Sequence, residues 1–122
     1  MLGIGVDTTT VSRIEKSAAS PAFMQRVYGP QERQLFAARA FPADGMAANF
    51  AAKEALAKAL GSGLFTFALA EAEVLRRESG APYFAFSGAL AAYMDKNRFL
   101  AHVSLTHEAG SATAFVMVEE RK

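Results

Sequence analysis

The sequence predicts an α+β fold in which a mostly antiparallel sheet packs on one long central helix. Residues 49–63 have the composition of a helix, rich in Ala, Leu, Lys and Glu and ended by two glycines. Short apolar or alternating runs, typical of strands, stand at the N-terminus and dominate the C-terminal half. The length of 122 residues suits a single domain, spanning 1–122, with one substantial core.

Composition and charge exclude several classes of protein. Hydrophobic residues make up 52% of the chain and charged residues 20%, a balance typical of folded soluble proteins. The net charge of +1 argues against broad electrostatic binding to nucleic acid. No apolar run reaches the roughly 18 residues of a membrane span, and the start lacks the basic region of a signal peptide. The absence of cysteine excludes disulfides and thiolate chemistry. We therefore expect a cytoplasmic protein.

The first element is an apolar run, residues 2–6, which is most simply a buried strand. Gly3 and Gly5 within it allow another backbone or a ligand to approach closely. Asp7 ends the run. An acid at the end of a buried strand is either a cap for the next element or a ligand on a rigid element, and the residues alone leave both readings open.

Three short helices are expected between this strand and the central helix. They begin near residue 10, after Pro21 and at Gln31. Ser12 and Glu15 fit a capping box at the start of the first helix. The first two helices present a modest basic face, formed by Arg13, Lys16 and Arg26. Such a face is usually only solvated surface.

The central helix is the most informative element. Its apolar side chains form one stripe that should face the core: Ala52, Leu56, Ala59 and Leu60. Glu54 and Lys58 lie one turn apart on roughly the opposite side. They form either an ordinary surface ion pair, worth about 0.3 kcal/mol, or a charged pair beside a ligand, with Ala51 and Ala55 as a floor of small residues.

The C-terminal half is expected to consist mainly of strands. The predicted elements are strands at 71–77 and 83–86, a helix at 88–99, and strands at 101–107 and 112–118. Pro82 lies in the turn that joins the first two strands into a hairpin. The fourth element alternates strictly, so His102, Ser104 and Thr106 share one face. That face is either solvent-exposed or the lining of a site.

Three blocks of this sequence resemble holo-acyl-carrier-protein synthases, members of the 4′-phosphopantetheinyl transferase family. The blocks are Gly3-Ile4-Gly5-Val6-Asp7 with Arg13-Ile14, Phe50-Ala51-Ala52-Lys53-Glu54-Ala55 with Lys58-Ala59, Gly61 and Gly63, and His102-Val103-Ser104-Leu105-Thr106-His107. They stand in the family's order and cover essentially the whole chain. The resemblance implies the family's fold and a homotrimer with active sites between subunits. It also implies a reaction: Mg²⁺-dependent transfer of 4′-phosphopantetheine from coenzyme A to a serine of an acyl carrier protein, with release of adenosine 3′,5′-bisphosphate.

The resemblance further assigns roles to individual residues. Asp7 and Glu54 match the family's metal ligands, and such hard carboxylates suit Mg²⁺ beside a pyrophosphate. Lys58 would place a positive charge against the phosphates and complete the catalytic set with Asp7 and Glu54. The coenzyme A cleft would be lined by Lys58, Gly61, Ser62, Gly63, Pro82, His102, Ser104 and Thr106. The acidic carrier protein would meet Arg13, Lys16 and Arg26.

Several alternatives stay open at this level. The base that deprotonates the carrier serine is either Glu54 or a water held by the metal, and Glu108 is either a third metal ligand or a turn residue. Asn49 stands where many relatives have a basic residue. The carrier belongs either to fatty-acid synthesis or to a polyketide or peptide assembly line. The alternative function is a non-catalytic module that binds coenzyme A or a carrier protein in the same cleft.

Overall fold

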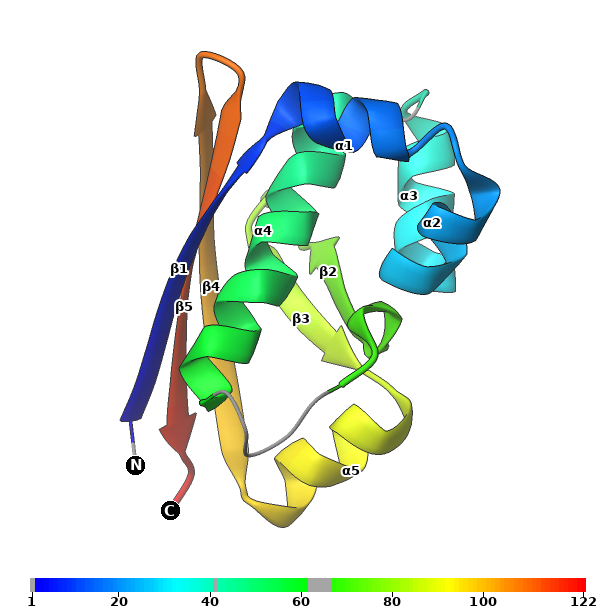
Figure 1. Ribbon diagram of the computed structural model, residues 1–122. Helices are drawn as coiled ribbons and strands as arrows, with labels where there is room; N and C mark the ends of the chain where they lie inside the picture. Colours follow the sequence, from blue (N-terminus) through cyan, green and yellow to red (C-terminus); the bar gives the residue numbers. More distant parts are fainter. Residues whose placement is uncertain (1, 41, 62–66) are drawn as a thin grey trace.

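The computed structural model describes residues 2–40, 42–61 and 67–122. Its central element is the long helix α4 (Ala43–Leu60), which lies between a three-stranded sheet and a two-stranded hairpin (Figure 1). The remaining helical elements are α1 (Val11–Ser17), α2 (Pro21–Val27), α3 (Pro30–Ala38), the 3₁₀ turn η1 (Leu69–Glu71) and α5 (Gly88–Lys96). The predicted α+β fold is confirmed. Among the described residues, no helix combines the length and the apolar character that crossing a bilayer requires.

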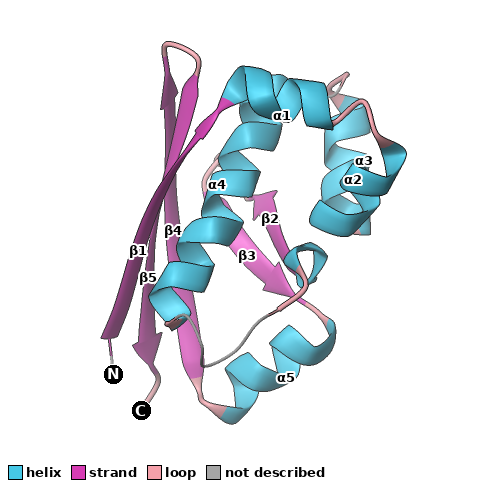
Figure 2. Cartoon of the chain, in the orientation of Figure 1, coloured by secondary structure: helices cyan, strands magenta, loops and turns pink. Residues whose placement is uncertain are grey.

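Both sheets are antiparallel (Figure 2). The larger has the strand order β1 (Leu2–Thr10), β5 (Ser111–Glu120), β4 (Phe99–Glu108), and the hairpin joins β2 (Ala72–Arg76) to β3 (Pro82–Phe86). The predicted hairpin and C-terminal strands are therefore confirmed. The first strand is longer than predicted, because β5 continues to pair with it as far as Thr10, opposite Ser111. Asp7 thus lies within β1, and the prediction that it ends the strand is wrong.

Small residues allow β1 and α4 to come into close contact. A Cβ on Gly3 would overlap the carbonyl oxygen of Ala59, and one on Gly5 would overlap that of Ala55. The predicted close approach of another backbone is thus confirmed. Ala51 and Ala55 are fully buried. The prediction that they form the open floor of a site is therefore wrong, because the backbone of β1 fills that space.

The core has two parts that share α4. The first lies between α4, the inner face of the larger sheet, the hairpin and α5, and includes Ala52, Leu56, Ala59, Leu60, Val74, Leu90, Met94, Val116 and Val118. This confirms the predicted apolar stripe. The second lies between α1, α2, α3 and the N-terminal half of α4, and includes Ile14, Val27, Tyr28, Phe36 and Met46. The Tyr28 hydroxyl donates to the Met46 carbonyl oxygen at 2.7 Å, so its polar atom is satisfied.

The helix and strand ends differ locally from the predictions. Helix α1 begins at Val11 and places Ser12 inside its first turn, so the predicted capping box is wrong. Glu71 belongs to η1 and not to the following strand. Its carboxylate instead accepts a hydrogen bond from the Leu90 backbone N–H at 3.0 Å, near the start of α5. Such ends depend on contacts with distant parts of the chain, which local patterns do not reveal.

A buried ion pair ties α4 to α3. Lys53 Nζ donates to Glu32 Oε1 at 2.7 Å, and both side chains are 0% exposed. Lys53 also donates to the carbonyl oxygens of Leu69 and Ala72, at 3.0 and 2.6 Å. All three donors of the ammonium are therefore used, as burial of a charge demands. Burial lowers the pKa of Lys53, and the neighbouring carboxylate of Glu32 opposes that shift.

The Glu32 carboxylate is the centre of a wider network. It accepts hydrogen bonds from the Asn49 side chain at 2.9 Å and from the backbone N–H groups of Gly29 and Val74 at 3.0 and 3.1 Å. Burial raises the pKa of this carboxyl group, and the bond from Lys53 counteracts it. One carboxylate thus connects α3, α4 and β2, and the position of α4 on the hairpin depends on it.

Candidate functional site

Two of the predicted catalytic residues meet where α4 lies against β1. Lys58 Nζ donates to Asp7 Oδ1 at 3.1 Å and to the Val6 carbonyl oxygen at 3.0 Å. The Asp7 side chain is 22% exposed and the Lys58 side chain 58% exposed. The ion pair therefore joins the helix to the strand, and is not the pair within the helix that spacing alone suggested for Glu54 and Lys58. A carboxylate and an ammonium group therefore lie together, accessible to solvent, where α4 contacts β1.

Glu54 lies beside this pair. It is half-buried and precedes Lys58 by one helical turn, on the same side of α4. The contacts of Gly3 with Ala59 and of Gly5 with Ala55 set an antiparallel register between β1 and α4. Continuing that register brings Asp7 alongside the helical turn that contains Glu54. Within the part of the chain that the structure describes, the Glu54 carboxylate makes no hydrogen bond or ion pair.

The chemistry of these two carboxylates fits a magnesium ion. Among the described residues, no group of three or more His, Asp or Glu side chains is arranged to hold a metal. Glu108 lies at the end of β4, at the sheet edge opposite to β1, so it does not join Asp7 within one chain. Mg²⁺ retains several waters and is typically bound by one or two carboxylates plus substrate phosphates. Asp7 and Glu54 offer that donor set.

A cavity of about 410 Å³ lies at the other edge of the sheet, next to β4. Pro82 and Thr106, both predicted to line the coenzyme A cleft, are in its wall. Two arginines that belong to none of the sequence motifs, Arg39 and Arg76, are also in the wall. Burial, and secondarily the charge of Arg39, lowers the pKa of Arg76. The volume suits a small-molecule ligand. The wall also contains Asp44, whose Oδ2 lies 3.8 Å from His107 Nδ1, and two guanidinium groups against this one carboxylate favour an anionic ligand.

Asn49 positions one of these arginines. Its side-chain oxygen accepts a hydrogen bond from Arg76 Nη2 at 2.9 Å, while its nitrogen donates to Glu32. The Asn49 side chain is fully buried. Asn49, where the resemblance suggested a basic residue, is therefore a neutral residue that accepts a hydrogen bond from a cation on β2.

His102 and Ser104 lie in a third place, on the face of the larger sheet that points away from α4. The predicted alternation is confirmed, because Val103 and Leu105 pack against the core on the other face. His102 Nε2 is 2.6 Å from Glu119 Oε2 on β5. The outer face also exposes four large apolar side chains, Ile4 (62%), Val6 (54%), Leu100 (42%) and Phe115 (46%). An apolar face of this kind is typical of a protein–protein interface.

Of the residues after α4 that were predicted to line the coenzyme A cleft, the structure describes only Gly61. Gly61 ends the helix with φ 87°, and its N–H donates to the Lys58 carbonyl oxygen at 3.2 Å. That amide is therefore engaged in the helix terminus. Ser62 and Gly63 lie outside the described residues.

The basic residues predicted to meet the carrier protein lie on α1 and α2, with exposed side chains. The Arg13 guanidinium lies over the Phe50 ring, 5.7 Å from its centroid, and that of Arg26 lies over the Phe23 ring at 6.0 Å. Lys16 is in the last turn of α1. The structure thus brings Arg13 and Arg26 onto neighbouring aromatic rings.

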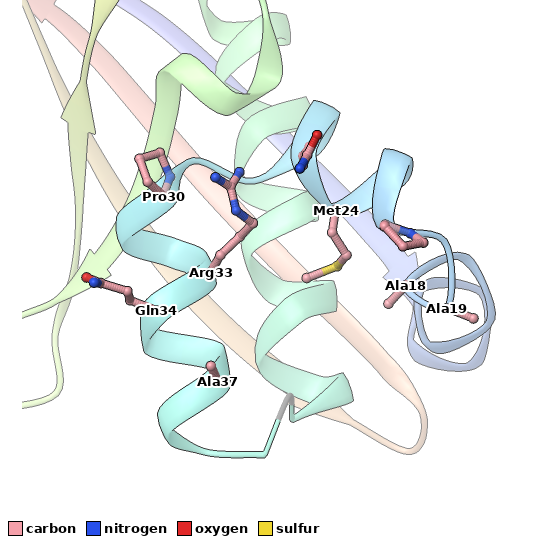
Figure 3. A pocket seen from close by; sticks show the side chains of 9 residues that line it. Ala18, Ala19, Met24, Pro30, Arg33, Gln34 and Ala37 are labelled. Atoms are coloured by element: carbon pink, nitrogen blue, oxygen red, sulfur yellow. The ribbon is translucent and has the colours of Figure 1, made fainter.

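A larger groove of about 680 Å³ lies between α2 and α3 and contains none of the predicted site residues (Figure 3). Its lining residues are Ala18, Ala19, Pro21, Met24, Gln25, Pro30, Arg33, Gln34 and Ala37. The lining offers no carboxylate, hydroxyl or imidazole group. Arg33, its charged member, donates to the Tyr28 carbonyl oxygen at 2.6 Å. The groove therefore lacks acid–base groups, and the reactive side chains of the described chain lie elsewhere.

Comparison with known proteins gives consistent matches over nearly the full length. The family model described as the 4′-phosphopantetheinyl transferase superfamily matches residues 3–115. A holo-[acyl-carrier-protein] synthase from Clavibacter michiganensis is 44% identical over 121 residues, 96% of this chain and 94% of the relative. The crystal structure of such a synthase from Neisseria meningitidis superimposes with a TM-score of 0.86 at 30% identity, covering 97% of this chain and 98% of that chain. The synthase from Bacillus anthracis, solved in complex with CoA (3′,5′-ADP), gives 0.78 at 30% identity, covering 98% and 96%.

Proposed function

The chain belongs to the 4′-phosphopantetheinyl transferase superfamily, and we propose from this that it is a holo-acyl-carrier-protein synthase. It transfers 4′-phosphopantetheine from coenzyme A to a serine of an acyl carrier protein and releases adenosine 3′,5′-bisphosphate. The observation that carries the proposal is the cluster of Asp7, Lys58 and Glu54, which joins two separate blocks of the family's sequence in space. Residues 1–122 would act as one transferase domain, and a cytoplasmic location stays a prediction.

The cluster suggests how the residues act in the transfer. The serine oxygen attacks the β-phosphorus of coenzyme A, a new O–P bond forms, and the bond to the bridging oxygen breaks. Lys58, whose side chain is 58% exposed, can turn its ammonium toward the phosphate oxygens and neutralise their charge. Glu54 can accept the serine proton on one carboxylate oxygen and leave the other for a metal ion, because neither oxygen has a partner within the described part of the chain, whereas Asp7 is engaged by Lys58.

We further propose that Asp7 and Glu54 together hold Mg²⁺. When bound there, Mg²⁺ supplies positive charge that stabilises the pyrophosphate oxygens during the transfer. The partial burial of both acids limits the number of waters that compete for their oxygens.

The cavity beside Pro82 and Thr106 is the proposed place for the nucleotide part of coenzyme A. Arg39 and Arg76 in its wall would bind phosphate oxygens, a role that matches the planar guanidinium group. Asn49 would hold Arg76 in position through the bond at 2.9 Å. This assignment adds Arg39 and Arg76 to the coenzyme A-binding residues that the sequence predicted.

A second copy of the chain is proposed to complete each active site, in a homotrimer. Asp7 lies on β1 at one edge of the larger sheet, and the cavity with Thr106 lies beside β4 at the other edge. His102 lies on the outer face, away from both. One chain therefore presents the predicted residues in three separate places. The exposed apolar side chains of that outer face supply a surface that a neighbouring copy can bury.

Replacement of Phe115 by aspartate is expected to disrupt this assembly. Phe115 is 46% exposed and central on β5, between Val6 and Ser104 of the flanking strands. A charge there costs little in a free chain but much in a buried interface. We expect the trimer mass to fall to that of the monomer in light scattering, with loss of at least about nine-tenths of the activity. Ala22→Asp, at an exposed position on α2, is the control. A Phe115→Asp protein that remains trimeric would contradict the proposed interface.

Intact-mass spectrometry of an apo acyl carrier protein tests the proposed function. The carrier is incubated with this protein, coenzyme A and Mg²⁺, and carriers from fatty-acid synthesis and from an assembly line are compared. We expect the carrier to gain the mass of one phosphopantetheine, and a chelator to abolish the gain. No gain with any carrier, despite binding of coenzyme A, would indicate a non-catalytic binding module instead.

A further inference from the structure

Two stacked aromatic rings connect the two arginines that lie on α1 and α2. The rings of Phe23 on α2 and Phe50 on α4 have centroids 6.4 Å apart and an interplanar angle of 28°. The Arg13 guanidinium carbon lies 5.7 Å from the Phe50 centroid, and that of Arg26 lies 6.0 Å from the Phe23 centroid. We call this group of four side chains the arginine–aromatic platform. It joins three helices that are separate in the sequence.

Packing against the core holds the Phe23 and Phe50 rings in place. Both phenylalanines are partly buried against the second core cluster. Phe23 also meets the ring of Tyr28 edge-on at 6.2 Å, and Tyr28 is fully buried and hydrogen-bonded to Met46. The two arginines are exposed. Rigid rings beneath exposed guanidinium groups restrict the conformations of two long side chains that would otherwise lose much entropy on binding a partner.

The charges of the platform are available to a partner. Within the described part of the chain, neither Arg13 nor Arg26 takes part in a salt bridge. A guanidinium group that stacks through its face keeps its N–H edges free for hydrogen bonds to carboxylates. Paired cations on an aromatic surface therefore match a partner that presents acidic side chains.

The platform is also close to the proposed catalytic residues. Phe50 precedes Glu54 by four residues in α4, so the two side chains lie on the same side of the helix, about 6 Å apart at their Cβ atoms. Arg13, held on Phe50, is thus within reach of a partner whose reacting group approaches Glu54. A partner bound at the platform would have its reacting serine directed toward the cluster.

We propose that Phe50 and Phe23 are positioning residues for the carrier protein. They hold Arg13 and Arg26 at a fixed spacing that matches carboxylates on an acidic face of the carrier. The inference rests on the proposed function and goes beyond it, because it assigns carrier recognition to two apolar side chains that make no charge contact themselves. It predicts that the contribution of Arg13 depends on the ring beneath it.

A double-mutant cycle with Phe50→Leu and Arg13→Met tests this dependence. Carrier conversion is followed by intact mass at saturating coenzyme A and Mg²⁺, with the carrier concentration varied. Each single substitution is expected to raise the KM for the carrier about 5- to 10-fold, with kcat and the KM for coenzyme A within about twofold of the original protein. The double variant should be no worse than Arg13→Met alone, because a ring without its guanidinium has nothing to position.

Salt dependence and a ring-retaining variant give independent readouts. The fall in carrier affinity with rising salt should be equally shallow in Phe50→Leu and Arg13→Met, since both lose the same charge contact. Phe50→Tyr keeps the ring and should behave like the original protein. Phe84→Leu, a partly buried phenylalanine on β3 that stacks on Phe86, serves as the matched control and should leave the KM for the carrier unchanged. Thermal unfolding checks that each variant is folded.

The outcomes separate this inference from the proposed function. Multiplicative effects in the double variant, or an equal rise of both KM values in Phe50→Leu, would overturn the positioning role. The absence of any mass gain with the original protein would overturn the proposed function, and this inference with it. If Phe50→Leu does not fold, the cycle of Phe23→Leu with Arg26→Met decides the question, because it uses a ring and an arginine that both lie on α2.

Discussion

Replacement of Glu54 by alanine is expected to lower the rate of carrier conversion by about 1,000-fold or more, the size of loss seen when a group that stabilises transition-state charge is removed. The fold should tolerate the change. Glu54 is half-buried, has no partner within the described chain, and lies in a helix that alanine favours. The measurement is the initial rate of carrier mass gain at saturating substrates, with urea unfolding as the check on stability.

Matched variants separate the roles within the cluster. Asp7→Asn should lower the rate of carrier conversion nearly as much as Glu54→Ala does. It should also raise the Mg²⁺ concentration required for half-maximal rate, because one charged ligand is lost. Lys58→Ala should lower the rate without that shift in metal requirement. Glu15→Ala on the exposed side of α1 is the control and should leave the rate unchanged. A Glu54→Ala protein that keeps more than a tenth of the original rate would contradict the catalytic role proposed for Glu54.

Local patterns predicted the elements of this fold, whereas the ends of the elements depend on distant partners. The apolar stripe of α4 was visible at helical spacing because the residues that form it are neighbours in sequence. The length of β1 was not visible in the sequence, because Thr10 remains in a strand only through its pairing with Ser111. Likewise Ala55 is covered by Gly5, a residue fifty positions away in the printed sequence, about which helical spacing says nothing.

The candidate site was predictable in part. Asp7, Glu54 and Lys58 were identified only because separate blocks resemble a known family, and the bond between Lys58 and Asp7 required the folded chain. Arg39 and Arg76 were missed, since arginines from α3's end and β2 share no motif and meet only in the cavity wall. The resemblance placed His102 beside Thr106 in one cleft. The two share a face of β4, but they are four residues apart along the strand and only Thr106 is in the cavity wall.

Lys53 was missed for a different reason. Lysine is rarely buried, so a lysine in a helical pattern is read as exposed. A signal was nevertheless present, because Asn49 and Lys53 are spaced by four residues and both border the apolar stripe that includes Leu56 and Leu60. Two polar side chains beside a buried stripe indicate a shared buried partner, which the structure identifies as Glu32.

Replacement of Lys53 by methionine is expected to destabilise the protein by about 3–5 kcal/mol, because it leaves the Glu32 charge buried without its counter-ion. Urea unfolding followed by far-ultraviolet circular dichroism measures the loss. Lys16→Met, at an exposed position on α1, is the matched control and should change the free energy of unfolding by less than about 0.5 kcal/mol. The contrast between two chemically identical substitutions isolates the effect of burial.

A second substitution distinguishes an unpaired charge from a packing defect. In Lys53→Met with Glu32→Gln, the charge of Glu32 is no longer there to be desolvated, while the amide oxygen of glutamine can still accept bonds from Gly29, Asn49 or Val74. Stability should therefore recover by about 1–2 kcal/mol relative to Lys53→Met alone. Further destabilisation in the double variant would show that lost packing, and not the unpaired carboxylate, causes the effect. Because α4 also contains Glu54, the same network that stabilises the fold fixes the helix on which the proposed chemistry depends.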